Sequence, residues 1–470
     1  MAIHWHRRDL RATDNLALAQ AVESDAPVVP LFVFDPVVLD HASPLRVACL
    51  RTAISALREW YREQGSDLLV ECGEASSVVP RVAAERDVDS VYWNEDYSGL
   101  ATNRDEAVAT ALEADERTVE TAHDAIHHEP GSITPNTGEH YSVFSYFWKK
   151  WRDRDKREAV DAPKGDDLAA IRADDTGSIP SIEEMGIEEI DIDPPRVTPT
   201  AARERVASFC AAPIYDYESG RDFPAADATS RLSVHLKWGT VGIREVYSAT
   251  QRAADRAADS TERESVEAFQ RQLAWREFYA HVLAFNPETV TENATAFERE
   301  IEWRNDPDEF EAWKRGETGY PIVDAGMRQL CDEGWVHNRV RMLVASFLTK
   351  DLLVDWRKGY DWFRRRLADH ETANDVAGWQ WAASTGFDAQ PYFRIFNPTK
   401  QGREYDPDAE YVRRHVPELA DATTDEIHGW HDSSDAERAR IAPSYPAPIV
   451  DHADCRDRAI DTFERAKNTE

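Results

Sequence analysis

The sequence predicts an α/β domain with a doubly wound parallel sheet, followed by an acidic linker and a larger all-α domain. Residues 1–127 alternate short apolar runs with amphipathic stretches, and residues 161–194 hold eleven acidic and two basic side chains. From about residue 200 the pattern is helical almost throughout. At ~150 residues per domain, a chain of 470 residues has room for these parts. We place the domains at 1–127 and 201–470, with the linker at 128–200.

The N-terminal part contains strand and helix signals in alternation. The apolar run Val28–Phe34 is typical of a buried strand, and apolar residues then recur at helical spacing between 47 and 61. Residues 67–70 and 90–93 are further strand candidates. This order predicts a parallel sheet with helices on both faces, whose ligands bind beyond the carboxyl ends of the strands. No glycine-rich phosphate loop is visible, so neither a Walker motif nor a dinucleotide fingerprint is present.

The rest of the chain divides into the linker and a helical part. Prolines punctuate the acidic stretch 161–194, which we expect to be extended and solvated. Farther on, apolar residues recur at spacings of three and four over 265–283, 322–330, 340–353 and 360–367. We therefore expect these four segments to be helices of one all-α domain.

Charge and cysteine content exclude several classes of protein. With 55 basic and 88 acidic residues the net charge is −33, so any contact with DNA needs a local arginine-rich patch. Only 10 of the basic residues are Lys, a composition that suits a halophile, in whose cytoplasm charges are screened beyond ~3 Å. The five cysteines are far apart, which excludes a zinc cluster or a disulfide framework and indicates a reducing compartment. Without an apolar run near ~18 residues or a signal pattern, we expect a soluble, cytoplasmic protein.

Tryptophan is abundant and unevenly placed. The chain has 15, and eight of them fall between residues 275 and 381. A large aromatic core would explain them. However, Arg276 follows Trp275, and Trp379 and Trp381 flank Gln380. Aromatic residues interleaved with Arg and Gln also suit stacking on a nucleic-acid base combined with phosphate contacts.

Two other stretches carry candidate ligand contacts. Residues 229–233 place three hydroxyls and one guanidinium at a loop-to-helix junction, which could cradle a diphosphate. The alternative for this stretch is an ordinary helix N-cap. Residues 369–371 and Asp375 place carboxylates where ribose hydroxyls or ring N–H groups could donate to them, and the alternative there is a solvated acidic loop.

Several long motifs occur in order along the chain. They are TGYPIVDA at 318–325, GWVHNR at 334–339, WQWAASTG at 379–386 and PYFRIFNP at 391–398, preceded by HRRDLR at 6–11. Together they resemble the photolyase/cryptochrome family over nearly the whole chain, except the acidic linker and the extreme C-terminus. Within that family the sequence most resembles the class I cyclobutane pyrimidine dimer photolyases of haloarchaeal type.

This resemblance implies a folded-back FAD in the helical domain, excited by blue or near-ultraviolet light. The residues that match cofactor-binding positions are Tyr217, Thr229, Ser230, Arg231, Leu232, Ser233, Phe269, Arg341, Asp369, His370, Glu371 and Asp375. The positive charge of Arg341 would stabilise a reduced, anionic flavin. The resemblance implies no metal.

The resemblance also implies a reaction, the light-driven splitting of cyclobutane pyrimidine dimers in DNA by an electron from photoexcited reduced FAD. The lesion would be flipped out of the duplex. The residues that match lesion- and DNA-contacting positions are Arg221, Gln272, Trp275, Arg276, Tyr279, Asn338, Arg339, Met342, Trp381, Arg394 and Gln401. Trp275 and Trp381 match the pair that packs on the dimer. We expect the protein to act on DNA as a monomer.

A tryptophan relay is a further implication. Trp303, Trp356 and Trp379 match the three residues that carry an electron from the surface to photo-oxidised flavin. Indole is readily oxidised, and short tunnelling steps are faster than one long step. Core packing is the alternative role for each, and the two roles are compatible.

Two departures from the repair enzymes favour an alternative, a cryptochrome-type photoreceptor that signals through a protein partner. Gln272 stands where repair enzymes commonly carry a Glu, and an amide cannot supply a proton. Asp375 occupies the position facing flavin N5, where plant cryptochromes have Asp. Against this alternative, plant cryptochromes usually have Tyr where this chain has Trp381, and the chain ends without a long signalling tail. Dimer repair is therefore the preferred interpretation.

Repair of the six-four photoproduct is a weaker alternative. Enzymes with that substrate carry consecutive histidines where this chain has His337 and Asn338, so the sequence disfavours it. A flavin electron-transfer protein that ignores DNA is a third hypothesis.

An antenna chromophore is the last implication of the resemblance. Phe32, Arg46, Asp96 and Lys237 match positions that surround a deazaflavin antenna in relatives that use one. An aromatic ring with cationic groups suits a flat, anionic chromophore. We therefore expect 8-hydroxy-5-deazaflavin rather than methenyltetrahydrofolate, and an empty pocket is the other alternative.

Overall fold

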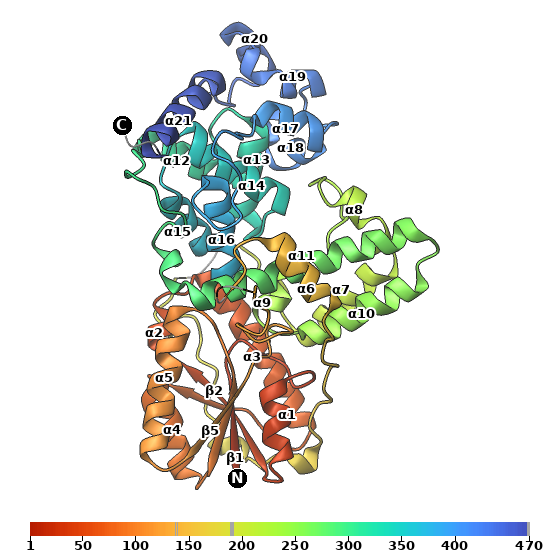
Figure 1. The fold of residues 1–470 in the computed structure, drawn as a ribbon, viewed down its shortest axis with the longest axis vertical. Helices are drawn as coiled ribbons and strands as arrows, with labels where there is room; N and C mark the ends of the chain where they lie inside the picture. The colour runs from red at the N-terminus through yellow and green to blue at the C-terminus, as the bar shows by residue number, and fades with distance from the viewer. Residues whose placement is uncertain (137, 139, 189–191, 468–470) are drawn as a thin grey trace. The chain divides into compact units, whose positions relative to one another are not determined.

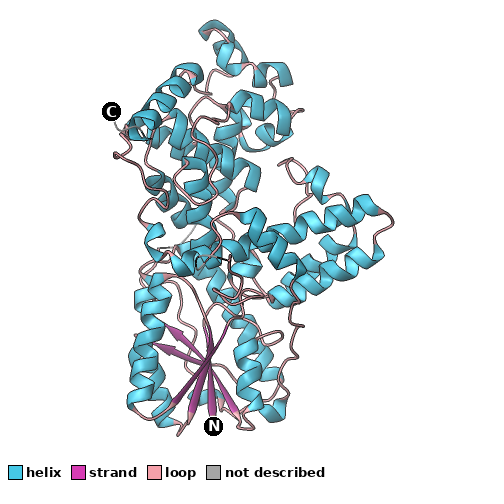
Figure 2. Cartoon of the chain, in the orientation of Figure 1, coloured by secondary structure: helices cyan, strands magenta, loops and turns pink. Residues whose placement is uncertain are grey.

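The computed structural model describes residues 1–136, 138, 140–188 and 192–467, and these form two compact units. The first unit comprises Met1–Glu218, Ser230–Pro287 and Ala368–Ala373, and the second comprises Ser219–Thr229, Glu288–Leu367 and Asn374–Glu470. The packing units do not follow the predicted boundaries at 127/128 and 200/201, which remain predictions about domains. Across the described residues the regular strands all lie before residue 123, and helices dominate the remainder (Figure 2).

A five-stranded parallel sheet forms the centre of the first unit (Figure 1). Its strands are β1 (Ala2–His6), β2 (Val28–Phe34), β3 (Leu69–Cys72), β4 (Ser90–Asn94) and β5 (Thr118–Ala122), in the order β3-β2-β1-β4-β5. Helices α1 (Leu16–Glu23) and α3 (Pro44–Glu63) cover one face, and α4 (Ala75–Glu85) and α5 (Gly99–Ala114) cover the other (Figure 1). The short α2 (Pro36–Leu39) follows β2. The predicted doubly wound sheet is confirmed.

The apolar run in β2 shows why this sheet forms. Phe32 and Phe34 pack into the core shared with α1 and α3, whereas Val29 and Leu31 pack into the core shared with α4 and α5. Successive side chains of a strand point to opposite faces, so a strand covered by helices on both sides needs an unbroken apolar run. Burial of each such side chain contributes roughly 1.5–3 kcal/mol to folding.

Residues 128–200, predicted as an acidic linker, contain more structure than expected. Helix α6 (Phe144–Asp153) stacks Phe144 on Trp275, with ring centres 3.6 Å apart. Farther on, the buried Leu168 forms a parallel bridge with Val28. Val28 precedes the point where β3 begins to pair with β2, so its open edge accepts this partner. The expectation that 161–194 is solvated is therefore wrong at Leu168, whereas α6 is a helix within the part assigned to the linker but outside that stretch.

The first unit is completed by helices that follow in the chain. They are α7 (Pro199–Ala211), α8 (Tyr217–Gly220, which crosses into the second unit), α9 (Ser233–Lys237), α10 (Ile243–Arg256) and α11 (Ser260–Phe285), with 3-10 turns at Gly165–Asp167, Ala173–Asp175 and Pro213–Tyr215. Helix α11 contains the predicted helix 265–283 and extends it at both ends.

The second unit is helical. After the 3-10 turn Pro287–Val290 its helices are α12 (Pro307–Arg315), α13 (Pro321–Glu333), α14 (Asn338–Ser346), α15 (Trp356–Arg366), α16 (Thr372–Ala383), α17 (Pro398–Tyr405), α18 (Glu410–His415), α19 (Thr424–His428), α20 (Asp435–Ile441) and α21 (His452–Lys467). Further 3-10 turns lie at Pro417–Leu419 and Trp430–Asp432. The predicted helices 322–330 and 360–367 are confirmed to within one residue, and 340–353 is helical as far as Asp351, with its last turn, Phe347–Asp351, in the π form.

Large aromatic side chains fill the core of the second unit. Trp313, Trp356, Trp379 and Trp430 are all buried there among aliphatic residues of α13 to α16. Throughout the described ranges, each helix lacks the length and apolar character needed to cross a bilayer.

Candidate functional site

A crevice opens at the carboxyl ends of β1 and β4. Strand β1 pairs with β2 on one side and with β4 on the other. The direction in which the chain adds strands to the sheet therefore reverses between β1 and β4. A small pocket within the first unit, with a free volume of about 20 Å³, occupies this place. Its lining is formed by Arg8, Asp9, Arg11, Asn94, Glu95, Asp124, Ala125, Leu236, Gly239, Val241, Ile243 and Arg276. The pocket thus lies where the sheet topology predicts a ligand.

The crevice is bordered by charged side chains that pair across long sequence distances. Arg8 donates from both terminal nitrogens to the two carboxylate oxygens of Glu371, one at 2.7 Å, and pairs with Asp96 at 3.5 Å. Arg276 lies 3.6 Å from the same Glu371 carboxylate. Burial favours the neutral form of Glu371, but the charge of Arg8 outweighs it and lowers the pKa of Glu371 to about 2. Burial lowers the pKa of the Lys237 ammonium to about 8 despite the neighbouring carboxylates.

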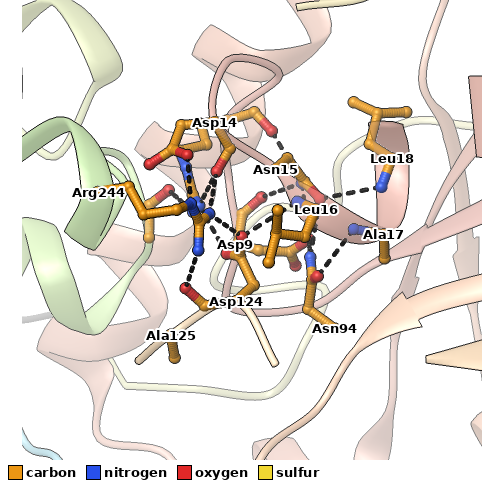
Figure 3. Close-up of polar contacts among 12 residues, drawn as sticks. Asp9, Asp14, Asn15, Leu16, Ala17, Leu18, Asn94, Asp124, Ala125 and Arg244 are labelled. Atoms are coloured by element: carbon orange, nitrogen blue, oxygen red, sulfur yellow. Dashed lines mark hydrogen bonds and ion pairs between the residues drawn. The ribbon is translucent and has the colours of Figure 1, made fainter. Parts of the chain in front are cut away.

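A buried ion-pair network joins α10 to the loop after β1 (Figure 3). Arg244 donates from Nε to Asp14 Oδ1 at 2.6 Å and from Nη2 to Asp124 Oδ1 at 2.5 Å. Arg11 donates to the other oxygen of Asp124 at 2.6 Å. Two guanidinium groups therefore face two carboxylates, and all four side chains are almost completely buried. This balanced network fixes residues that line the crevice.

His4, His6 and Asp9 also cluster at this end of the sheet, close enough for a common ion. However, Asp9 Oδ2 already accepts hydrogen bonds from the side-chain amides of Asn15 at 2.8 Å and Asn94 at 2.6 Å. Two N–H donors at that oxygen disfavour a cation. The cluster is therefore a hydrogen-bonded support for the loop after β1.

The four residues predicted for an antenna chromophore lie in the first unit. Phe32 is buried in β2, with its ring centre 5.0 Å from that of Phe34. Arg46, buried in α3, donates to the His41 carbonyl at 2.9 Å. Asp96 follows β4, and its pKa is lowered because Arg8 and Lys237 outweigh the effect of burial. Only Asp96 and Lys237 of these four take part in the charged border of the crevice.

The predicted cofactor residues fall in both units. In the first, Phe269 of α11 packs against Tyr217, with ring centres 5.3 Å apart and the rings nearly perpendicular. Asp369 and His370 are buried, while Glu371 is held by Arg8 as described. In the second unit, Arg341 Nη1 lies 3.7 Å from Asp375 Oδ1.

The predicted diphosphate stretch 229–233 leads into α9, which Ser233 begins. The N-cap residue Leu232 makes no side-chain hydrogen bond of its own, but its backbone N–H donates to the Ser230 hydroxyl at 3.3 Å, so one hydroxyl of this stretch already serves the start of the helix. Thr229 and Ser230 are half-buried and Ser233 is exposed, so these hydroxyls lie within reach of a ligand. Hydroxyls of this kind can donate hydrogen bonds to the diphosphate of FAD.

Several residues predicted to contact lesion or DNA lie on α11. Trp275 is half-buried and stacks on Phe144, and Tyr279 lies beside it, with ring centres 5.2 Å apart. Gln272 is half-buried and donates only to the Ala268 carbonyl of its own helix, at 3.3 Å. Arg276 is mostly buried, because its guanidinium donates to the Ala125 carbonyl and pairs with Glu371.

The other predicted DNA residues lie in the second unit. Arg339 pairs with Asp222 at 2.8 Å, and its guanidinium carbon lies 4.2 Å from the centre of the Tyr405 ring. Asn338 is exposed and donates to the Met342 sulfur at 3.6 Å. The remaining members are exposed or half-buried: Arg221, Trp381, Arg394 and Gln401.

The tryptophans of the predicted relay belong to one aromatic core in the second unit. Trp356 and Trp379 are buried members, and the half-buried Trp303 packs against the same core. A side chain at Gly359 would overlap the Trp379 indole, so Trp379 rests on α15 one turn from Trp356. Trp303 also contacts Phe463 of α21 edge to face, with ring centres 6.0 Å apart.

The backbone next to Trp303 runs beside the residues that precede α15. The N–H of Arg304 donates to the Leu353 carbonyl at 2.8 Å, and Asn305 Oδ1 accepts from the N–H of Asp355 at 3.0 Å. The structure therefore brings the three predicted relay residues into one region of the second unit.

Some site residues could not be found by pattern. The Arg8–Glu371 pair joins positions 363 residues apart, and no local signal connects them. Asn293, which accepts a hydrogen bond from the Trp356 indole, belongs to no motif. The residues of α6 did carry a signal, since Phe144, Phe147, Trp148 and Trp151 recur at spacings of three and four.

Comparisons with known proteins agree with this architecture. The family described as "DNA photolyase" matches residues 2–164, and the one described as "FAD binding domain of DNA photolyase" matches residues 269–465. A cryptochrome from Synechocystis sp. PCC6803 shares the fold, with a TM-score of 0.89 at 24% identity over 98% of this chain and 99% of the other. The two-part fold therefore defines a protein of photolyase/cryptochrome architecture.

The relatives with higher identity are photolyases. A deoxyribodipyrimidine photo-lyase of Halobacterium salinarum is 55% identical over 100% of both chains, and one from a Synechococcus strain is 38% identical over 96% of this chain and 93% of the other. The solved class III photolyase of Agrobacterium tumefaciens is 35% identical, with a TM-score of 0.88 over 100% of this chain and 98% of that one. The chain belongs to the DNA photolyase family, and its FAD-binding part is that family's.

Proposed function

We propose that this protein repairs DNA by splitting cyclobutane pyrimidine dimers with light. The observation that carries the proposal is the 55% identity, over the whole of both chains, to a protein named as a deoxyribodipyrimidine photo-lyase. This similarity favours repair over cryptochrome signalling. The aromatic core with Trp303, Trp356 and Trp379 supports light-driven electron transfer as the chemistry.

FAD is the cofactor that the chain's residues fit. The hydroxyls at 229, 230 and 233 suit its diphosphate, and the Tyr217–Phe269 pair supplies an apolar wall. When bound, FAD absorbs near-ultraviolet or blue light and supplies one electron to the dimer. Arg341 contributes the positive charge that favours an anionic ring, and Asp375, 3.7 Å from it, matches the position that faces N5.

The lesion is bound by aromatic stacking more than by charge. Trp275 and Trp381 pack on the flipped dimer, while Gln272, Tyr279, Asn338 and Met342 complete its contacts. Phosphates are contacted by Arg221, Arg339, Arg394 and Gln401, since these are accessible. Arg276 does not contact phosphate directly, because its guanidinium donates to the Ala125 carbonyl and pairs with Glu371. The protein acts as a monomer, which light scattering of the DNA complex would test.

The function is tested by incubating reduced holoprotein with a dimer-containing oligonucleotide under near-ultraviolet light. We expect intact pyrimidines to reappear in the light and not in a dark control. Binding of damaged DNA without repair would overturn the proposal and leave the photoreceptor alternative. Equal binding of damaged and undamaged duplex would favour a flavin electron-transfer protein instead.

Trp381→Ala is expected to weaken lesion binding. Stacking of a base on an aromatic ring is worth about 1–3 kcal/mol, so the dissociation constant should rise about 5- to 150-fold. Trp60→Ala, which removes a half-buried tryptophan from α3, is the control and should bind as the wild type does. Titration of fluorescent damaged duplex measures both. An unchanged affinity for Trp381→Ala would contradict its place in the lesion pocket.

For the crevice of the first unit we propose an antenna chromophore, 8-hydroxy-5-deazaflavin rather than methenyltetrahydrofolate. The proposal is supported by the resemblance, since Asp96 and Lys237 match antenna positions and lie at the charged border where Arg8 and Arg276 pair with carboxylates. Phe32 and Arg46 are buried, and we assign them a role in supporting the fold around the crevice. Release of the bound pigments by denaturation, followed by chromatography and fluorescence, would distinguish the two chromophores and a crevice without one.

A further inference from the structure

The middle tryptophan of the relay has an unusual neighbour for its indole N–H. Trp356 is fully buried, and its Nε1–H donates to Asn293 Oδ1 at 2.9 Å. The same oxygen accepts a second hydrogen bond from Arg357 Nη2 at 3.3 Å. Because two donors converge on it, this atom is the carbonyl oxygen of the amide and not its nitrogen. The amide is thereby fixed with its acceptor toward the indole.

Arg357 is held in place by several contacts of its own. Its Nη1 donates to both oxygens of Asp355, at 3.1 and 3.2 Å, and its Nε donates to the Thr291 carbonyl at 2.5 Å. Its guanidinium carbon lies 4.8 Å from the centre of the Trp356 ring. The carboxylate of Asp355 also accepts from the backbone N–H of Arg357 at 3.0 Å, so both of its oxygens are engaged by donors of Arg357.

These contacts have a chemical consequence for an oxidised indole. An indole that has lost one electron becomes a strong N–H acid, and a base at its nitrogen takes the proton and leaves a neutral radical. A carboxamide oxygen accepts a hydrogen bond but is a far weaker base than a carboxylate, and here it is weakened further by the Arg357 donor. A guanidinium has donors only. The groups around Trp356 thus accept a hydrogen bond from its indole N–H but are too weakly basic to deprotonate it.

We propose that Asn293, oriented by Arg357, is a positioning residue that keeps the indole proton on Trp356 while charge passes through it. This inference rests on the relay of the proposed function. One electron leaves Trp356 to refill Trp379, which photoexcited oxidised flavin has oxidised. Trp356 then takes one electron from Trp303 and becomes neutral indole again, with its N–H bond never broken. The net change is the one-electron oxidation of Trp303 and the one-electron reduction of the flavin. Trp303 is half-buried and can release its proton to water.

The matched pair Asn293→Asp and Asn293→Ala tests this role. A carboxylate at 293 would take the proton and trap Trp356 as a neutral radical, so we expect most of the photoreduction yield of oxidised holoprotein to be lost. Alanine provides no base but leaves the indole N–H without its acceptor, so its yield should fall much less than that of Asn293→Asp. A merely structural role predicts the opposite, with alanine at least as harmful as the nearly isosteric Asp. That result would overturn the inference.

A second measurement leaves Asn293 untouched and therefore does not depend on how its variants fold. In Trp303→Phe the charge stops at Trp356, and flash absorption distinguishes the protonated radical cation from the neutral radical. We expect the cation to persist until the charge recombines, with no effect of buffer base or of D2O. A neutral radical at Trp356 in this variant would overturn the inference. Absence of any tryptophan radical in the wild type would instead contradict the relay itself, and hence the proposed function.

Discussion

Trp303→Phe should abolish the light-driven reduction of oxidised flavin while leaving repair by chemically reduced enzyme near the wild-type rate. Trp303 is the only half-buried member of the proposed relay, whereas Trp356 and Trp379 are buried. Phenylalanine keeps the contact with Phe463 but is much harder to oxidise than indole. The charge therefore returns from Trp356 to the flavin before an external reductant can intervene. Repair needs only the reduced cofactor and the lesion, so it does not pass through Trp303.

Two assays on the same preparation measure this separation. Photoreduction is followed by the bleaching of oxidised flavin under illumination with an external reductant, and repair by recovery of intact oligonucleotide after dithionite reduction. Trp362→Phe is the matched control, because Trp362 is also half-buried and packs against the same core. It should retain photoreduction. Photoreduction that survives in Trp303→Phe would mean that another residue supplies the electron.

The sequence predicts the elements of this fold well because their signals are local. The run Val28–Phe34 is apolar without interruption since both faces of β2 are covered, and α11 carries its periodic apolar face within one segment. The signal is weaker where composition and packing disagree. Residues 128–200 are acidic, yet Leu168 is buried beside Val28 because β2 has an open edge there. The burial of Leu168 therefore depends on the sheet, whose strands are formed by residues elsewhere in the sequence.

The candidate site is only partly predictable for the same reason. Motifs indicated residue types such as Trp303, Trp356 and Trp379, and the structure groups them in one core. Motifs did not indicate which partners those residues would have. Glu371 was predicted as a cofactor contact, yet its carboxylate is held by Arg8, 363 residues away. Partners of this kind are set by the tertiary fold, which brings distant and individually unremarkable residues together.

Arg244→Met should destabilise the first unit by about 3–5 kcal/mol, since it leaves buried carboxylates without their partner. In the wild type the Arg244 guanidinium, 1% exposed, bonds the side chains and backbone carbonyls of both Asp14 and Asp124. After the substitution only Arg11 remains to balance these two carboxylates. Methionine fills similar volume, so the loss reflects unpaired charge more than a cavity. Because the net stability of a typical protein is about 5–15 kcal/mol, this is a large share of it.

The same substitution should make stability depend on pH in a defined direction. Burial already raises the pKa of Asp14, and Arg244 and Arg11 oppose that rise. Without Arg244 the folded-state pKa rises further above the unfolded value, so the folded variant holds a proton that the unfolded chain releases. Its deficit relative to the wild type should therefore be small near the unfolded pKa and grow as pH rises through the folded one. Urea unfolding at constant salt measures this at two pH values. Arg203→Met, which removes a partly exposed partner of Glu245 beside α10, is the control and should cost about 0–1 kcal/mol. Equal destabilisation by the two substitutions would contradict the argument that buried pairing, and not charge alone, holds the loop after β1 to α10.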